Sequence, residues 1–244
     1  MRLSAGRSGV DADAAVAALA ASRCPELGAF QAGSEASALR LRWEGTPAQA
    51  PPRANALGAA GAYAVAGDEV KVWLPEDPLA AEAALRLAFA VAFHGQGGLL
   101  LHAAGICFGG GGAWLGVGSS GCGKSTLAQR CADAGGEVLS DETVGWLPDG
   151  TVWPTPFRSS ARFVRRGAPA PLSVLAFLEH GDAERLEPLP AAEAVRRLLA
   201  QVYRTPGAPV LHAAALIARA GAQRFRFRND PEAAAFVKRA LGGE

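Results

Sequence analysis

Hydrophobic and polar residues follow two different periods in the first third of the chain. An Ala-rich stretch over residues 12–22 predicts a helix, and residues 37–43 alternate apolar and basic side chains as a half-exposed strand does. Residues 62–75 show two period-2 runs about a Gly-Asp step, which predicts a hairpin. Residues 1–77 are therefore expected to form a small α+β lobe.

Residues 78–244 alternate between helical and strand-like patterns and are expected to form the larger domain. A helical run begins at Pro78, and two strand-like runs, 99–108 and 113–117, are joined by glycines. The second run leads into a glycine-rich stretch, then a predicted helix from Lys124 to Ala134, a strand and a second hairpin. Hairpins thus flank this stretch where common nucleotide-binding proteins have a parallel βαβ unit, so we expect an α/β fold with a mixed sheet.

The C-terminal third continues this alternation. In residues 222–229 three arginines alternate with two phenylalanines, the pattern of a half-buried strand. The other elements expected here are a buried strand over 172–179, a helix over 191–204 and a helix over 230–241 that starts with an Asp-Pro cap.

Composition narrows the classes of function. The chain of 244 residues carries 24 Lys and Arg against 23 Asp and Glu, a net charge of +1, so no global field attracts nucleic acid or an anionic membrane. The apolar run Leu87–Phe93 is far shorter than the about 20 residues of a bilayer span. The four cysteines show no CxxC spacing, so we expect free thiols and a cytoplasmic protein.

Residues 118–125, Gly-Ser-Ser-Gly-Cys-Gly-Lys-Ser, match the phosphate-loop pattern GxxxxGK[ST] in full. Backbone N–H groups in such a turn form an anion nest at the start of a helix. Lys124 is expected to reach the β and γ phosphates of ATP, and the Ser125 hydroxyl is expected to ligate Mg²⁺. The residues expected to bind nucleotide are Gly118, Ser119, Ser120, Gly121, Cys122, Gly123, Lys124, Ser125 and Thr126.

Two acidic residues follow the next strand. Asp141 and Glu142 are expected beside the loop if their strand neighbours the strand before it, with Asp141 as the general base and Glu142 on the metal side. Both carboxylates are candidate Mg²⁺ ligands, although neighbouring strand residues face opposite ways, so both roles require a strand end here. An acidic turn that faces solvent is the alternative.

Two further residues are candidates for catalysis. His102 lies in the strand before the glycine turn, and a hairpin would bring it back toward the loop; the alternative is a hydrogen-bonded core histidine. Arg158 belongs to an Arg-rich stretch after the second hairpin and is a candidate clamp for the γ-phosphoryl group or for an acceptor carboxylate. A solvated charged face is the alternative for that stretch.

Taken together, "LLLHAAGI", "GVGSSGCGKSTLA" and "GGEVLSDE" resemble the catalytic domain of the HPr serine kinase/phosphorylase family. The resemblance implies a nucleotide fold of the phosphoenolpyruvate-carboxykinase type. It implies an active-site histidine at His102 and a catalytic acidic pair at Asp141 and Glu142, where the family has two aspartates. The chain shows no copy of the family's glycine-rich substrate loop. Its small N-terminal lobe is more similar to compact relatives that phosphorylate a serine of ribosomal precursor peptides, including lasso peptides.

We therefore expect an ATP- and Mg²⁺-dependent kinase that transfers the γ-phosphoryl group to a serine of a peptide or small protein. A kinase for a small metabolite alcohol and a nucleotide-gated binding module that transfers nothing are the alternatives. Neither a nucleic acid nor a membrane is an expected partner, and members of the resembled family often form oligomers.

Overall fold

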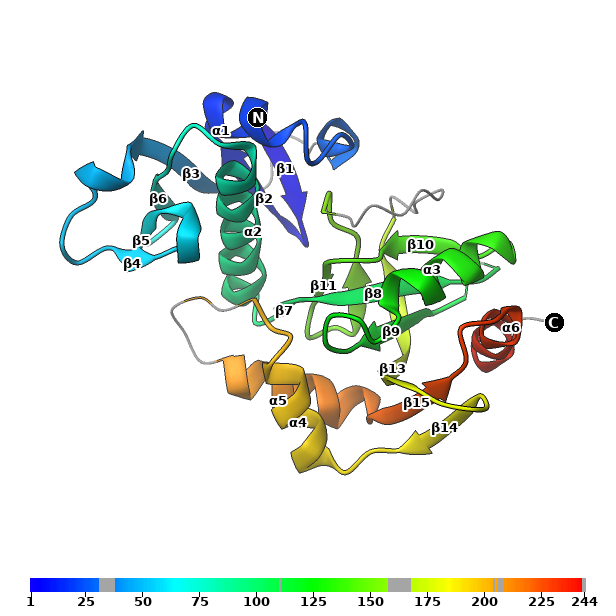
Figure 1. Cartoon of the computed structure of the whole chain (residues 1–244). Coiled ribbons are helices and arrows are strands. Elements are labelled where there is room, and N and C mark those ends of the chain that lie inside the picture. The colour runs from blue at the N-terminus through cyan, green and yellow to red at the C-terminus, as the bar shows by residue number, and fades with distance from the viewer. Residues whose placement is uncertain (31–37, 110, 158–167, 204, 206–208, 243–244) are drawn as a thin grey trace. The chain divides into compact units, whose positions relative to one another are not determined.

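The computed structural model describes residues 1–30, 38–109, 111–157, 168–203, 205 and 209–242 (Figure 1). The chain divides into two compact units. The first comprises Met1–Gln96 with Arg204–Pro206, and the second comprises Gly97–Tyr203 with Gly207–Glu244. The sequence pattern predicts this boundary after residue 77, whereas the first unit also contains the long helix that begins at Pro78, because that helix packs on earlier strands.

The first unit is built on a six-stranded mixed sheet. Its strands are β1 (Arg2–Ala5), β2 (Ser8–Ala12), β3 (Ala38–Gly45), β4 (Asn55–Ala56), β5 (Ala62–Ala66) and β6 (Glu69–Trp73). They lie in the order β1-β2-β3-β6-β5-β4, and β3 is parallel to both β2 and β6. The expected hairpin over residues 62–75 is confirmed as the antiparallel pair β5 and β6.

Two helices pack on this sheet, α1 (Ala14–Ala20) and α2 (Pro78–Gly95), and they also pack against each other. Leu85, Phe89 and Phe93 of α2 are fully buried, and their spacing of four residues puts them on one face of the helix. The described residues of this unit also form short 3₁₀ turns, η1 (Leu27–Phe30), η2 (Pro47–Gln49) and η3 (Gly58–Ala60).

The second unit contains a larger mixed sheet, and its strands run from β7 to β15. Their bounds are β7 (Leu99–Leu101), β8 (Ala103–Cys107), β9 (Ala113–Val117), β10 (Glu137–Ser140), β11 (Val144–Trp146), β12 (Thr151–Trp153), β13 (Ala170–His180), β14 (Arg185–Pro188) and β15 (Gln223–Phe227). The main path is β10-β8-β9-β13-β12-β11-β7, and β15 pairs with β13 and β14. Since β13 is parallel to β9 and β15 and antiparallel to β12, the expected mixed sheet is confirmed.

The run over residues 99–108, expected as one strand, is divided at His102. β7 pairs with β11, whereas β8 pairs with β9 and β10. His102 occupies the bend between β7 and β8. One apolar run therefore supplies two strands with different neighbours. The strands are separated at His102, the polar side chain in the centre of the run.

Both hairpins expected around the glycine-rich stretch are confirmed. β8 and β9 form an antiparallel pair before it, and β11 and β12 form another after it. Helix α3 (Lys124–Asp133) connects β9 to β10, but β10 is not adjacent to β9 because β8 lies between them. The acidic pair therefore follows β10, which is separated by β8 from β9, the strand that leads into the loop.

Helices cover both faces of this sheet (Figure 1). Leu127 of α3 and Val237 of α6 (Pro231–Ala240) share one buried cluster with Trp114 of β9. On the other face, α4 (Ala191–Leu199) and α5 (Pro209–Ala220) contribute to a second cluster that contains Leu115 and Val117 of the same strand. The alternation along β9 thus gives each face its own apolar core.

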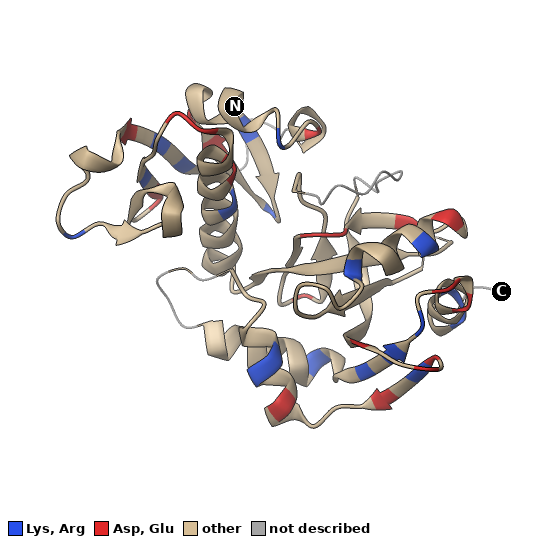
Figure 2. Ribbon diagram, in the orientation of Figure 1, with Lys and Arg blue, Asp and Glu red and all other residues tan. Residues whose placement is uncertain are grey.

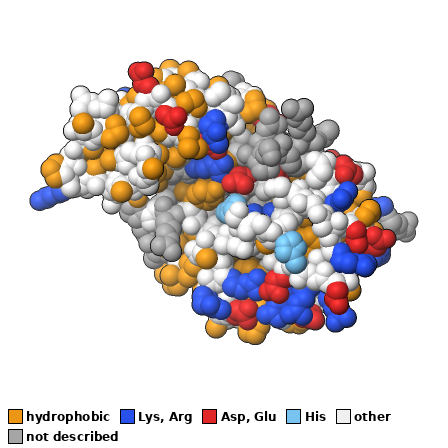
Figure 3. All heavy atoms as spheres, in the orientation of Figure 1, with side chains coloured by type: hydrophobic (Ala, Val, Ile, Leu, Met, Phe, Trp, Pro, Cys, Tyr) orange, Lys and Arg blue, Asp and Glu red, His pale blue; other side chains and the backbone are white. Residues whose placement is uncertain are grey.

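The predicted pattern of β15 is confirmed. Phe225 and Phe227 are buried, whereas Arg224 and Arg226 pair with Glu179 of β13 at 3.2 and 3.4 Å. Figure 2 shows the basic positions along β15 in blue. On the face shown in Figure 3, basic and acidic side chains are interspersed. No helix within the described residues combines the length and the apolar character needed to cross a bilayer.

The start of α2 provides a test of this packing. Asp77 caps the helix, since its carboxylate accepts a hydrogen bond from the backbone N–H of Ala80 at 2.9 Å. Asp77→Ala should lower the free energy of unfolding by about 1 kcal/mol, measured by chemical denaturation followed by circular dichroism. Asp230 holds the same position at α6 without a side-chain capping bond, so Asp230→Ala should cost less. Equal losses would show that the bond to Ala80 is not what stabilises α2.

Candidate active site

The loop between β9 and α3 requires glycine at two positions. Gly123 has a φ of 97°, and a Cβ there would lie 2.9 Å from Phe227 Cζ. A Cβ on Gly118 would lie 2.4 Å from Cys122 Sγ. Side chains at these positions would therefore force the loop to open.

The loop is packed around the Lys124 side chain. Lys124 is 6% exposed, and its Nζ donates hydrogen bonds to the backbone oxygens of Gly118 at 2.7 Å and Ser119 at 3.1 Å. Burial lowers the pKa of Lys124 from its usual value. The Cys122 side chain and the carboxylates of Glu142 and Asp141 act in the opposite direction, so both acidic residues lie within electrostatic reach of the ammonium group.

A cavity of about 210 Å³ lies over this loop, and we call it the loop pocket. It brings together residues that are far apart in sequence and that were selected as candidates from sequence. The described residues that line it are His102, Ser120, Gly121, Gly123, Lys124, Ser125, Thr126 and Glu142. The other expected loop residues, Gly118, Ser119 and Cys122, do not line it, and Cys122 is buried in the core beneath.

The acidic pair follows the end of β10, where the strand alternation no longer applies. Ser140 fixes this turn: its Oγ donates to the backbone oxygen of Phe157 at 2.7 Å and accepts from the N–H groups of Glu142 and Thr143. Asp141 is fully buried, whereas the Glu142 side chain is 27% exposed. The alternative of a solvent-facing acidic turn therefore does not describe Asp141.

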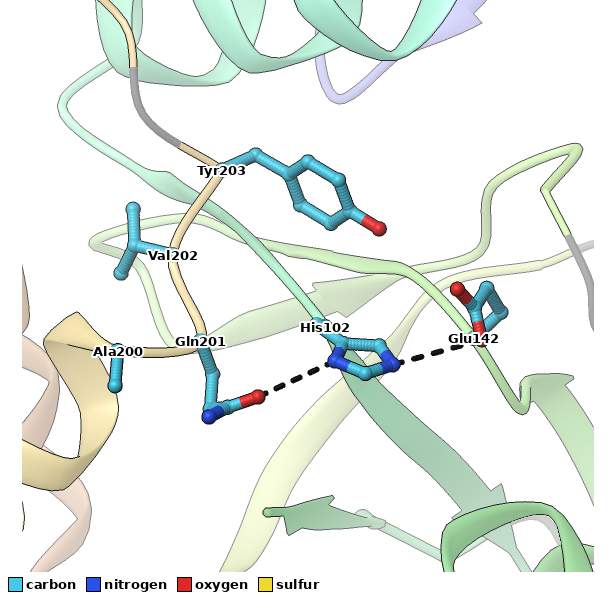
Figure 4. Close-up of a pocket in the computed structure, with 6 residues that line it drawn as sticks. All are labelled: His102, Glu142, Ala200, Gln201, Val202 and Tyr203. Carbon is cyan, nitrogen blue, oxygen red and sulfur yellow. Dashed lines mark hydrogen bonds and ion pairs between the residues drawn. The ribbon is translucent and has the colours of Figure 1, made fainter. Parts of the chain in front are cut away.

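His102 lies between the acidic turn and a segment from the end of α4 (Figure 4). Its Nε2 is 3.5 Å from Glu142 Oε2, and its Nδ1 is 3.2 Å from Gln201 Oε1. The imidazole is thus held at both ring nitrogens. It is a partly exposed residue of a cavity wall, in contrast to the alternative of a buried core histidine.

His102 and Glu142 also line a second cavity of about 210 Å³, which we call the side pocket. Its other described lining residues are Ala200, Gln201, Val202 and Tyr203. The local sequence does not predict Gln201 or Tyr203 as site residues, because nothing in the pattern distinguishes them from the end of the helix expected over residues 191–204.

His180 is another residue that sequence reasoning did not select. It ends β13, and its Nε2 lies 2.9 Å from the backbone oxygen of Gly121 in the loop. Since β13 runs parallel to β9, both strands end at the same edge of the sheet, and a polar residue at that end was the available signal. Arg158 lies outside the described residues.

The described residues contain no group of three or more His, Cys, Asp or Glu side chains that could hold a metal ion. Ser125 and Glu142 nevertheless line the same pocket and supply the oxygen ligands that Mg²⁺ prefers.

All four cysteines are buried free thiols, and burial raises the pKa of Cys131 to about 12.

No protein-family model matches the chain, and a search of curated proteins finds no significant match.

The two loop glycines with positive φ offer a matched test. Alanine at Gly121, where φ is 83° and no atom lies within 4 Å of a Cβ, should cost only the backbone strain of about 1–2 kcal/mol. Gly123→Ala adds the overlap with Phe227 and should lower the urea midpoint further. If the two variants unfold at the same midpoint, Phe227 does not restrict the loop.

Proposed function

We propose that this protein is an ATP-dependent kinase that transfers the γ-phosphoryl group to a serine hydroxyl of a peptide or small protein. The observation that carries the proposal is that His102 and Glu142 line two adjoining pockets. One pocket lies over a glycine-rich loop with a buried lysine, and the other combines polar side chains with Ala200 and Val202. Phosphoryl transfer requires a phosphate cradle and an acceptor position close to each other, and two pockets that share His102 and Glu142 are suited to this.

The loop pocket has the chemistry of a polyphosphate site. Its walls combine backbone N–H groups at the start of α3, the Lys124 ammonium and the hydroxyls of Ser120, Ser125 and Thr126. A helix N-terminus and a lysine together stabilise several negative charges at short range. The full GxxxxGKS spacing supports the same assignment.

Ser125 and Glu142 line the loop pocket and would hold Mg²⁺, with the charge of the buried Asp141 behind them. Magnesium is bound in such sites by one or two carboxylates together with substrate phosphates, so two oxygen donors on one wall are sufficient. When bound, Mg²⁺ neutralises charge that develops on the phosphate oxygens. We also propose that the fold is of the HPr-kinase type. The antiparallel hairpins on both sides of the loop support this part of the proposal.

Burial favours an exchange of the roles that the sequence analysis assigned to the acidic pair. Glu142 lines both pockets and contacts His102, whereas Asp141 is fully buried and lines neither. We therefore assign the general base to Glu142, whereas Asp141 acts on the metal side through its charge, close to Lys124, without entering the pocket. The additional methylene of glutamate, relative to the second aspartate of the resembled family, lengthens its reach toward an acceptor.

In the proposed reaction, the acceptor oxygen forms a bond to the γ-phosphorus, and the bond from that phosphorus to the β–γ bridging oxygen breaks. The nucleoside diphosphate leaves with that oxygen, and the hydroxyl proton passes to the Glu142 carboxylate. His102 holds Glu142 in place through Nε2, and Lys124 balances the charge of the phosphates. Arg158 remains a proposed clamp for the γ-phosphoryl group.

The acceptor class also remains a proposal. A peptide serine, as in precursor-peptide biosynthesis, is suggested by the sequence resemblance and by the small first unit. The four free thiols suit a reducing compartment, and we propose that the kinase works in the cytoplasm.

The function is tested by incubating the protein with Mg²⁺, γ-labelled ATP and an array of short peptides that carry a single serine. Label recovered on peptide serine by mass spectrometry supports the proposal. Label on an added metabolite, or ATP binding with no labelled product from any acceptor, contradicts it. Lys124→Ala should abolish labelling and weaken ATP binding, whereas Lys71→Ala, at an exposed lysine of the first unit, should change neither.

The exchanged roles of the acidic pair predict different kinetics for two conservative variants. Glu142→Gln should lower the transfer rate by about 100-fold or more with little change in ATP affinity, because the base is lost. Asp141→Asn should instead raise the Mg²⁺ concentration needed for half-maximal rate. Titrating the rate against Mg²⁺ separates the two, and the opposite pattern would restore the assignment made from sequence.

A further inference from the structure

We propose that the side pocket is the acceptor site of this kinase, and that Gln201 and Tyr203 select an acceptor whose reactive hydroxyl has no negative charge beside it. The proposal rests on the proposed function and adds to it the place and the chemistry of acceptor recognition. It is carried by the backbone pairing of residues 200–203, the side chains they present, and the charges of the pocket wall.

The segment that follows α4 is held as an extension of the sheet edge. The His102 N–H donates to the Gln201 oxygen at 2.8 Å, and the Tyr203 N–H donates to the Leu100 oxygen at 3.0 Å. Between these bonds Leu101 and Val202 form an antiparallel bridge. A segment fixed in this way beside β7 presents its side chains in a defined direction.

The strand alternation separates these side chains by function. Val202 is buried in the core with Leu198, and it points away from Gln201 and Tyr203 (Figure 4). Gln201 and Tyr203 are directed toward His102 and Glu142 (Figure 4). Two polar side chains thus face the two residues that the pockets share.

Each of these side chains is positioned by a neighbour. The Tyr203 hydroxyl lies 3.2 Å from Thr143 Oγ1, next to the acidic turn, and Thr143 is fully buried. The Gln201 carbonyl oxygen faces His102 Nδ1 at 3.2 Å, so the amide nitrogen, with its two donor hydrogens, is directed elsewhere. A neutral amide and a phenol in fixed positions suit hydrogen bonding to a hydroxyl and to the peptide groups around it.

The charges of the two pockets differ although their volumes are equal. The loop pocket contains Lys124, whereas the described residues that line the side pocket include no lysine or arginine and one carboxylate, Glu142. An anionic group placed there would lose water and meet the Glu142 carboxylate, and the described lining residues offer no lysine or arginine to offset either cost. The side pocket therefore favours a serine or threonine in a neutral setting over an acceptor with a carboxylate or phosphate next to its hydroxyl.

The experiment uses the full chain and two matched sets of serine peptides, one with Asn and one with Asp directly after the serine. Wild type should phosphorylate the Asn peptides with the higher kcat/KM. Tyr203→Phe and Gln201→Leu should each raise the KM for the Asn peptides by about tenfold, with ATP affinity and slow ATP hydrolysis by water changed less than about twofold. Tyr63→Phe and Gln129→Leu make the same chemical changes outside the pocket and should leave the KM unchanged.

A gain of function guards against variants that merely fold poorly. Gln201→Lys places a cation in the side pocket and should shift the preference toward the Asp peptides by about tenfold. An unchanged preference in Gln201→Lys, or an unchanged KM in both loss variants, overturns the acceptor-site assignment while the kinase proposal stands. If wild type labels no peptide at all, the kinase proposal itself fails.

Discussion

The candidate site depends on a single break in a strand, at His102. Without this break, residues 99–107 would form one strand that pairs with the same two neighbours throughout. His102 would then be an ordinary strand residue within the sheet. Because β7 turns toward β11 while β8 stays with β9, the histidine is left in a bend with both ring nitrogens in contact with other segments. The loop pocket and the side pocket share His102 for this reason. The two pockets lie on either side of His102 because β7 and β8 pair with different strands.

A second constraint is the turn after β10. Ser140 holds this turn with one donated and two accepted hydrogen bonds, so the acidic residues point where the backbone directs them. The result is one carboxylate in the interior near the ammonium of Lys124 and one at the pocket surface. Two adjacent residues of similar chemistry thereby occupy different environments, which is how proteins give two carboxylates separate roles.

Local sequence was sufficient for the elements that have strong local signals. The glycine-rich loop, α3 and both flanking hairpins were predicted because glycine turns and alternating apolar runs determine them over a few residues. The break at His102 was not predicted, because the apolar run 99–108 has no proline or internal turn signal at that point. Nor was the contribution of Gln201 and Tyr203, since it arises from a bridge between Leu101 and Val202, about a hundred positions apart in the chain. The membership of α2 in the first unit likewise depends on tertiary packing rather than on its helical pattern.

The hydrogen bonds of Lys124 have a consequence for selectivity. Its ammonium group is already held by two carbonyls of the same loop, Gly118 and Ser119. Any anion that draws this group to itself must compete with those carbonyls, whose dipoles are preorganised and cost nothing further to orient. A weakly charged anion with one point of attachment gains little from such an exchange, whereas a chain of phosphates gains several contacts at once. Under the proposed function, the loop would therefore discriminate between anions by their number of negative charges, independently of any contact with base or sugar.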